Sequence, residues 1–340
     1  MAFTPSYIGL YRSGELARRA SALEAMLESC TVCPHDCGNN RRKDELARCA
    51  TGYLPVVSSY TAHFGEEPLL VGTRGTGNIF FGNCNLRCVY CQNHLISQNH
   101  REERLRVVSF ERLAEIMLEL QERGCHEIGF VSPSHVVPQI VRALVLAAGQ
   151  GLRLPLIYNT NAYDSVEVLR LLDGVIDIYL PDLKYGDEDL AYAYSKVRRY
   201  PEVARAAIRE MHRQVGSALL TGEDGLVQRG LIIRHLVLPN DLAGSRESLR
   251  WVREELGPTV TLSIMAQYFP AHRAAETPLL DRTIRQSEYE RVLETMERLG
   301  LEEGWVQDPT SQEYYRPEFS DRETPFAGGP RNHDEELRST

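Results

Sequence analysis

The stretch IFFGNCNLRCVYCQN, residues 79–93, places three cysteines directly behind a short apolar run. Cys84, Cys88 and Cys91 have the spacing C-x3-C-x2-C, which would also put three small buried side chains on one face of a helix. Gly82 and the neighbouring asparagines disfavour a helix interior. The apolar run predicts a strand that ends at the cysteines, where parallel barrels place their active loops.

Closely spaced cysteines in a long chain without an export signal indicate metal binding rather than disulfides. Thiolates ligate iron–sulfur clusters, and a cubane cluster normally takes four, so three thiolates leave one iron open. An open coordination position is what a metal needs in order to contact a substrate. A tetrahedral zinc ion with His94 as its fourth ligand is the alternative.

A second cysteine group lies earlier, in the segment CTVCPHDCGNNRRKDELARC. Cys30, Cys33, Cys37 and Cys49 have the spacing C-x2-C-x3-C-x11-C, and four thiolates can close a zinc site or bind a second cluster. We expect a metal-organised knuckle here, with zinc and iron–sulfur both open. Cys125 follows a glycine at a helix end and is expected to be a packed thiol.

Composition narrows the class of protein. The chain has 340 residues, 38 Lys+Arg against 47 Asp+Glu, and a formal charge of −9, which argues against a general nucleic-acid binder. No apolar run approaches the ~20 residues that span a bilayer. The N-terminal residues lack the apolar core of a secretory signal. We therefore expect a cytoplasmic protein without a membrane segment.

Six apolar runs alternate with helical patterns beyond the first cysteine group. The expected strands read NIFF, EIGFV, LPLIY, VIDIYL, LIIRHLVLP and TVTLSIM. Ser109 is a plausible N-cap of the helix that begins SFERLAEIM. Near-continuous β-branched runs indicate strands buried on both faces, as in a parallel sheet covered by helices. We expect an α/β fold, a partial (β/α)6 TIM-like barrel with an N-terminal cysteine-rich metal knuckle; a doubly wound open sheet is the competing topology.

The expected organisation has three parts. Residues 1–54 carry an N-terminal helix and the four-cysteine knuckle, and residues 55–300 form the partial barrel. Residues 301–340 form a C-terminal tail, which from about residue 316 is polar and rich in Gly and Pro. We expect that tail to be loose or draped on the surface.

The cysteine motif, with Tyr90 as the aromatic residue before the third cysteine, resembles the signature of the radical SAM superfamily. Further segments sharpen this resemblance: HFGEEPLLVG (63–72), DIYLPDLKY (177–185), GLIIRHLVLP (230–239) and MAQYFP (265–270). They are similar to the pyruvate formate-lyase activating enzyme-like, or PflX-like, branch. The resemblance covers most of residues 30–300.

The resemblance implies that Cys84, Cys88 and Cys91 hold a [4Fe–4S] cluster whose open iron binds S-adenosylmethionine (SAM). One electron from the cluster would cleave SAM, and the resulting 5′-deoxyadenosyl radical would abstract hydrogen from a substrate. The implied enzyme is a radical SAM oxidoreductase. Its substrate, whether protein, peptide or small molecule, is not identified, and its electron donor would be a protein such as flavodoxin or ferredoxin.

The resemblance also points to cofactor-binding residues at the ends of successive strands: Tyr90, Ser132, Ser134, His135, Asn159, Asn161, Asp182, Lys184 and Arg234. The family's Gly-Gly-Glu-like motif is absent, so the serines and histidine in FVSPSH match by position alone. Arg234 could hold the carboxylate of SAM, while His235 points oppositely and could be a satisfied buried histidine. His63, Glu66 and Glu67 could contact substrate or form a solvated turn.

Two other functions stay open. An activase would install a glycyl radical on a protein partner. A zinc-binding interaction protein without catalysis would bind zinc at both cysteine groups and would not bind SAM.

Overall fold

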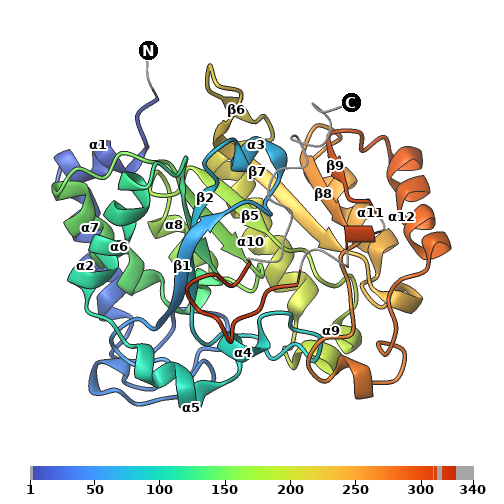
Figure 1. Cartoon of the computed structure of the whole chain (residues 1–340), viewed down its shortest axis with the longest axis horizontal. Coiled ribbons are helices and arrows are strands. Elements are labelled where there is room, and N and C mark those ends of the chain that lie inside the picture. Colours follow the sequence, from blue (N-terminus) through green and yellow to red (C-terminus); the bar gives the residue numbers. More distant parts are fainter. Residues whose placement is uncertain (1–2, 309, 312–315, 327–340) are drawn as a thin grey trace.

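The computed structural model describes residues 3–308, 310–311 and 316–326. Over these residues the chain forms a nine-stranded sheet wrapped by helices (Figure 1). The strands are β1 (Val57–His63), β2 (Thr76–Phe81), β3 (Ile128–Val131), β4 (Leu156–Thr160), β5 (Ile178–Pro181), β6 (Leu220–Thr221), β7 (Val227–Leu236), β8 (Thr261–Met265) and β9 (Gly304–Val306).

Strand order follows chain order. The sheet runs β1-β2-β3-β4-β5-β7-β8-β9, and every neighbouring pair from β2 to β9 is parallel. β1 pairs antiparallel with β2, and β6 forms an antiparallel hairpin with β7. A doubly wound sheet would reverse its strand order at a switch point. This order never reverses, so the predicted α/β class with a mostly parallel sheet is confirmed and the competing topology is wrong.

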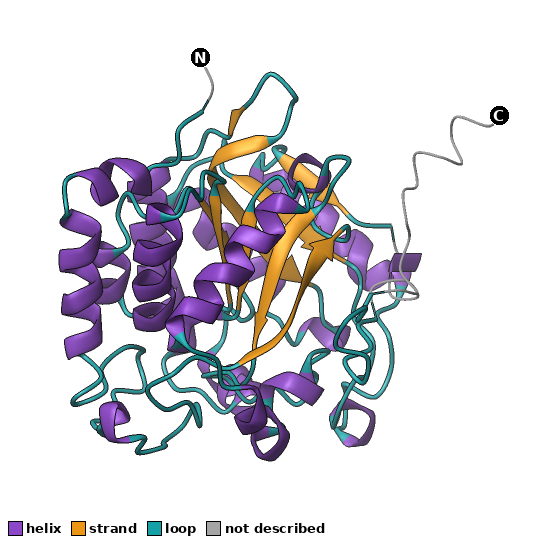
Figure 2. Ribbon diagram, turned by 60° about the vertical axis from the view of Figure 1, so that its left-hand side comes forward, coloured by secondary structure: helices purple, strands orange, loops and turns teal. Residues whose placement is uncertain are grey.

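Helices surround the strands on the outside (Figure 2). The α-helices are α1 (Tyr7–Arg12), α2 (Glu15–Ala25), α3 (Pro68–Val71), α4 (His94–Ser97), α5 (His100–Glu103), α6 (Phe110–Glu122), α7 (Val137–Gly149), α8 (Val166–Leu171), α9 (Glu188–Ser195), α10 (Tyr200–Val215), α11 (Ser245–Glu255) and α12 (Gln286–Leu299). The predicted cap is present, because the Ser109 hydroxyl accepts a hydrogen bond from the backbone N–H of Arg112 at 3.1 Å. α2 packs on α7, which seats the N-terminal segment on the barrel.

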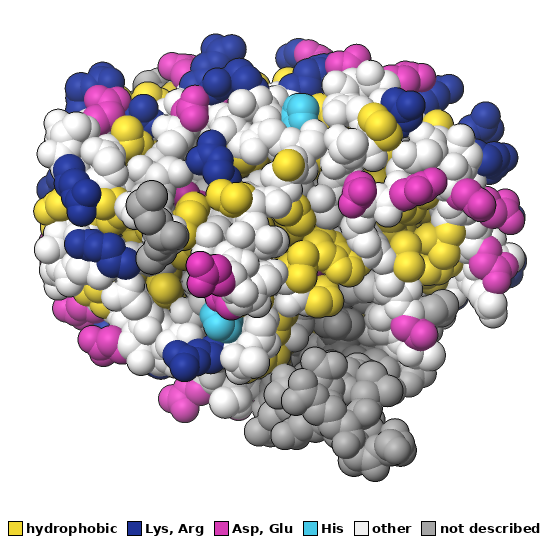
Figure 3. Space-filling view, turned by 90° about the horizontal axis from the view of Figure 1, so that it is seen from above, with side chains coloured by type: hydrophobic (Ala, Val, Ile, Leu, Met, Phe, Trp, Pro, Cys, Tyr) yellow, Lys and Arg dark blue, Asp and Glu magenta, His cyan; other side chains and the backbone are white. Residues whose placement is uncertain are grey.

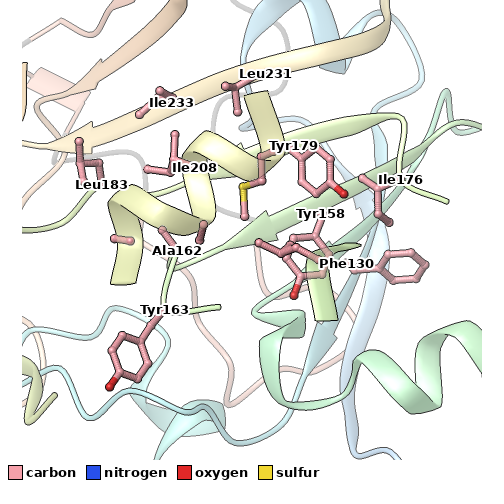
Figure 4. Packing of buried hydrophobic residues seen from close by; sticks show 14 of the residues in the cluster. Phe130, Tyr158, Ala162, Tyr163, Ile176, Tyr179, Leu183, Ile208, Leu231 and Ile233 are labelled. Atoms are coloured by element: carbon pink, nitrogen blue, oxygen red, sulfur yellow. The ribbon is translucent and has the colours of Figure 1, made fainter. Parts of the chain in front are cut away.

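Successive side chains along each strand point to opposite faces of the sheet, so the buried residues form two separate groups. Tyr158, Tyr179 and Ile233 belong to the large cluster between the sheet and the helices, part of which Figure 4 shows. Ile178 and Ile232 belong to a smaller cluster on the opposite, concave side of the sheet. Side chains two or four residues further along the same strands therefore point into the concave side near the C-terminal ends.

The described part of the C-terminal tail packs against the barrel and does not lie loose. Phe319 is 1% exposed and packs with Phe80 on the concave side of β2. Arg322 forms an ion pair with the buried Glu103 at 2.9 Å. In this segment an aromatic side chain packs on apolar residues and an arginine pairs with a glutamate. The amino-acid composition of the tail does not reveal these contacts. Residues 327–340 of the predicted tail lie outside the described residues.

Charged side chains of both signs are interspersed on the face seen in Figure 3, without a large basic patch on that face. Within the described residues, no helix combines the length and the apolar character needed to cross a bilayer.

Candidate functional site

The three cysteines lie on an irregular loop that follows the C-terminal end of β2. Cys84 and Cys88 are each 8% exposed, and donors from other elements point at their sulfur atoms. The Ser195 hydroxyl at the end of α9 donates to Cys88 Sγ at 2.9 Å, and the Asn161 amide lies 3.6 Å from Cys84 Sγ. Hydrogen bonds to sulfur stabilise thiolates and tune iron–sulfur clusters.

Burial controls the protonation of these thiols. It raises the pKa of Cys84 to about 11 and that of Cys91 to about 12, and the pKa of Cys88 is raised for the same reason. Neighbouring thiols add to the effect, because Cys88 lies close enough to raise the pKa of both others. Without a metal the thiols are protonated at neutral pH, and metal binding must displace their protons. Three converging, donor-supported sulfur atoms fit a metal cluster.

His94 does not complete the three-cysteine group as the zinc alternative requires. Its Nδ1 lies 3.2 Å from the carbonyl oxygen of Cys91, and its ring stacks on that of His272 with centroids 4.8 Å apart. In the part of the chain that the structure describes, no group of three or more His, Cys, Asp or Glu side chains is arranged to hold a single metal ion.

The end of β4 is tied directly to the cysteine loop. The Asn161 amide donates to Asn85 Oδ1 at 2.8 Å, and Asn161 Oδ1 accepts from the backbone N–H of Tyr163 at 3.0 Å. Asn85 in turn donates to the carbonyl oxygen of Tyr163 at 2.9 Å. Asn161 therefore orients the loop beside Cys84. Asn159 is half-buried on β4, and its carbonyl oxygen accepts from the backbone N–H of Ser132 at 2.9 Å.

Ser132, Ser134 and His135, the predicted residues that follow β3, do not all contact the same part of the protein. Ser132 adopts a left-handed backbone conformation with φ 58°, and the Ser134 hydroxyl lies 3.0 Å from that of Thr160. His135 Nε2 lies 3.1 Å from the carbonyl oxygen of Gly82, and the ring also borders the four-cysteine group. The structure brings Ser134 to the end of β4 but places His135 between the two cysteine groups.

Two ion pairs occupy the concave side at the ends of β5 and β7. Lys184 Nζ lies 2.7 Å from Asp182 Oδ2, as alternation along the extended segment predicts. Burial alone would lower the pKa of Lys184, but Asp182 and then Cys88 outweigh it and raise the pKa to about 12. Lys184 is therefore a cation close to the three-cysteine site at any physiological pH.

Arg234 is held by two acidic residues from the loop before α3. It contacts both oxygens of Glu67, at 2.8 and 2.5 Å, and it also pairs with Glu66. Asn78 on β2 donates to Glu66 at 2.6 Å. Burial alone would raise the pKa of Glu66, but Arg234 lowers it overall. Glu66 and Glu67 thus form a buried network with Arg234 rather than a solvated turn.

Two of the predicted residues, His235 and Tyr90, are buried and contact other side chains or backbone atoms of the protein. His235 is 1% exposed, and its ring nitrogens lie 2.7 Å from the carbonyl oxygen of Leu183 and 2.8 Å from the Ser245 hydroxyl. It is the satisfied buried histidine that the alternative interpretation describes. Tyr90 is 6% exposed and packs edge-on against Tyr268 at 6.0 Å between ring centroids.

The four-cysteine group lines a small cavity of about 10 Å³. Its walls include Cys30, Cys33, Cys37, Cys49 and His135. Cys37 is exposed, whereas the other three cysteines are buried. The four cysteines thus line one cavity, and the metal-organised knuckle stays a prediction.

Several supporting residues had no signal in the sequence. Ser195 lies 107 residues from Cys88, whose sulfur it contacts, and Ser97 lies 3.1 Å from Cys91 Sγ. A serine near a helix end is too common to be singled out. Only the tertiary structure shows that these hydroxyls face thiols.

Comparisons with known proteins agree with this site. A family model described as Radical SAM superfamily matches residues 78–222, which include the cysteine loop and the ends of β3, β4 and β5. The uncharacterized protein MJ0674 of Methanocaldococcus jannaschii is 29% identical over 286 residues, covering 82% of this chain and 77% of that protein.

Solved structures match over part of the fold. HydG, described as a maturase of the [FeFe]-hydrogenase, has a TM-score of 0.46 at 13% identity, covering 72% of this chain and 55% of its own. Native anSMEcpe with bound AdoMet and Cp18Cys peptide has a TM-score of 0.43 at 12% identity, covering 64% and 56%. The chain thus spans slightly more than half the length of these two structures. Residues 78–222, which carry the cysteine loop, are thus similar to the radical SAM superfamily.

Proposed function

We propose that this protein is a radical enzyme in which Cys84, Cys88 and Cys91 hold a [4Fe–4S] cluster. The observation that carries the proposal is that three thiols, two buried and one half-buried, lie together at the C-terminal end of β2, each with a hydrogen-bonding neighbour. When bound, the cluster supplies one electron that breaks the sulfonium C–S bond of SAM, giving methionine and a 5′-deoxyadenosyl radical that takes a hydrogen atom from the substrate.

Lys184 is our candidate for the carboxylate of SAM. An ammonium has three donors, and Asp182 accepts from only one side of it. Arg234, the residue that the resemblance suggests, is already engaged by both oxygens of Glu67 and by Glu66. We propose that Arg234 instead fixes these two carboxylates on the concave side, where they face a cationic ligand.

Asn161 would act by positioning rather than by contact with SAM. Its amide links β4 to Asn85 on the cysteine loop at 2.8 Å. Ser132, Ser134, His135 and Asn159 belong to strand ends that border the same edge of the sheet. We retain Asn159 as a candidate SAM contact because it is half-buried and lies on β4, two residues before Asn161.

The finer assignment, an activase of the PflX-like branch, requires a site that admits a glycine loop from a protein partner. The described tail weighs against an open entrance, since Phe319 fills the concave side beside Phe80 and Val131. We therefore favour a small molecule or a short peptide as substrate over a folded protein partner.

The four-cysteine cavity supports a second metal site. Four converging thiols suit either zinc or an iron–sulfur cluster. A protein that binds only zinc at both groups would instead be the interaction protein without catalysis, and its metal content would reveal that.

The test compares Cys88→Ala with Cys125→Ala, because Cys125 is a buried cysteine outside both groups. Both proteins are purified without oxygen and assayed for iron, and for 5′-deoxyadenosine formed from SAM with dithionite. We expect Cys88→Ala to lose cluster iron and SAM cleavage while Cys125→Ala keeps both. SAM cleavage at the wild-type rate in Cys88→Ala would falsify the proposal.

A further inference from the structure

Residues 318–326, here called the C-terminal loop, form a compact segment that closes on itself. The backbone N–H of Glu318 donates to the carbonyl oxygen of Pro325 at 2.8 Å, so the two ends of the loop meet. Inside it, the Asp321 carboxylate accepts from the backbone N–H of Thr324 at 3.1 Å. In Figure 1 the loop, in dark red, runs between β1 and α4. These internal hydrogen bonds let the loop keep its shape as a unit.

Two aromatic rings of the C-terminal loop enter the concave side of the barrel. Phe319 and Phe326 pack on Phe80, with ring centroids 5.3 and 5.4 Å away. They share this cluster with Ile96 on α4 and Val131 at the end of β3. The two rings therefore cover an apolar surface that is built from three different elements of the barrel.

This apolar surface adjoins the cysteine loop. The carbonyl oxygen of Ile96 accepts from the backbone N–H of Asn83 at 2.8 Å, and Asn83 is the neighbour of Cys84. Phe80 lies on β2, four residues before Cys84. Under the proposed function the radical forms at the cysteine loop, and a substrate must come close to it. The rings of the C-terminal loop thus fill space that a substrate needs.

A buried polar atom lies beside the same rings. His63, the last residue of β1, stacks on Phe326 with ring centroids 4.1 Å apart. Its Nδ1 is buried and has no hydrogen-bond partner among the described residues. Burial lowers the pKa of His63, so the imidazole is neutral at neutral pH and one ring nitrogen donates while the other accepts. A polar group on a ligand would supply the partner that the C-terminal loop does not provide.

The polar attachment of the C-terminal loop to the barrel is small. Among the described residues it comes from Arg322, which pairs with Glu103 at 2.9 Å and whose carbonyl oxygen accepts from the Ser59 hydroxyl at 2.5 Å. Nη1 of Arg322 is buried without a partner in the described chain. Most other residues of the loop are exposed. Few polar contacts and exposed backbone are typical of a segment that opens locally while the fold stays intact.

We propose that the C-terminal loop is a lid that occupies a substrate subsite, and that this subsite takes an aromatic group with a hydrogen-bonding group beside it. The inference rests on the proposed function and names the class of its substrate. The aromatic group would replace Phe319 and Phe326 on Phe80, because aromatic rings pack on one another at similar centroid distances of about 4.5–7 Å. The polar group would bond to His63. Opening moves only one short loop, which suits the small molecule or short peptide favoured above.

The first measurement follows the lid in the unaltered chain. Trypsin must take the Arg322 side chain into its own pocket, so it cleaves there only after the ion pair with Glu103 is broken. The probe is N-acetyl-L-phenylalaninamide, and the control ligand is N-acetyl-L-alaninamide, which lacks the ring. We expect saturating probe to speed cleavage after Arg322 at least threefold, while the control ligand leaves the rate unchanged. Equal rates with the two ligands overturn the proposal.

The second measurement compares affinities for the same probe by isothermal titration calorimetry. Phe319→Ala with Phe326→Ala removes the competing rings, and Tyr192→Ala, which changes an exposed aromatic residue on α9, is the matched control. We expect the double variant to bind the probe at least tenfold more tightly than the wild type, and Tyr192→Ala to bind it like the wild type. A folded double variant that binds the probe no more tightly than the wild type contradicts the subsite.

The polar half of the subsite has its own variant. His63→Phe, added to Phe319→Ala with Phe326→Ala, keeps an aromatic ring but removes the ring nitrogens. We expect it to weaken probe binding at least fivefold relative to the double variant, and an unchanged affinity would contradict the role of His63. All these measurements use reconstituted protein without a reductant, so SAM is not cleaved. A failure of the proposed radical chemistry would therefore show in SAM cleavage and not in these results.

Discussion

Glu127, directly before β3, gives the sharpest test of the physical description of this fold. It is 1% exposed, and neither of its carboxylate oxygens has a hydrogen-bond partner among the described residues. Burial, and then the nearby Asp224 and Glu66, raise its pKa from 4.5 to about 9. It lies at the end of β3 opposite the cysteine loop, so replacing it by glutamine should change stability without reaching the proposed site.

The expected size follows from linkage between protonation and folding. Between pH 4.5 and about 9 the unfolded chain has this carboxylate ionised while the folded chain keeps it protonated. The folded state therefore holds the extra proton, and its stability falls as pH rises through this range. One pKa unit corresponds to about 1.4 kcal/mol, so raising the pH from 6 to 8 should cost the wild type about 2.7 kcal/mol that Glu127→Gln does not lose.

The assay is urea denaturation of the wild type, Glu127→Gln and Glu122→Gln at pH 6 and pH 8. Glu122 is an exposed glutamate at the end of α6 and serves as the matched control. Titrations common to all three proteins cancel in the differences between them. We expect the stability advantage of Glu127→Gln over the wild type to grow with pH by roughly the amount above. An advantage that is the same at both pH values refutes the description of Glu127 as a buried neutral acid.

Two further predictions concern buried ion pairs. Arg234→Met leaves Glu66 and Glu67 buried without their cation, so we expect a loss of about 3–5 kcal/mol in thermal or urea denaturation, part of which Glu67→Gln should restore in the same protein. An Arg234→Met protein as stable as the wild type would show that the network is solvated. Arg322→Met breaks the ion pair with Glu103, whose side chain is fully buried. We expect limited proteolysis within residues 316–326 to become faster while the barrel stays resistant. Equal cleavage rates in the variant and the wild type would mean that other contacts hold the tail.

The hydrophobic pattern within short segments was sufficient to predict the parallel strands. The run LIIRHLVL predicts a strand buried on both faces, and β7 is that strand, with Arg234 on the concave side and His235 hydrogen-bonded to Leu183 and Ser245. The spacing of Asp182 and Lys184 predicts that both point the same way, and their ion pair confirms it. Period-two alternation is a local property, so it can be read without knowing what lies across the sheet.

Long-range partners could not be predicted in the same way. Glu67 pairs with Arg234 across 167 residues, and Ser195 contacts Cys88 across 107. Sequence shows a charged residue inside a buried strand and predicts that it has a partner, but many acidic residues could serve. Burial of Phe319 is a similar case, because a single aromatic residue in a polar segment has no periodicity from which a buried face could be recognised.

The charges on the concave side bear on the ligand that it receives. Glu66, Glu67 and Asp182 provide three carboxylates, against the two cations of Arg234 and Lys184, so the set carries one negative charge in excess. Free SAM carries a sulfonium, an ammonium and a carboxylate, and is therefore a net cation. A buried set with the opposite excess attracts such a ligand, because charges interact more strongly where water is excluded. A neutral or anionic molecule in the same place would leave a carboxylate uncompensated, so the side chains beside the cysteine loop favour a cationic cosubstrate.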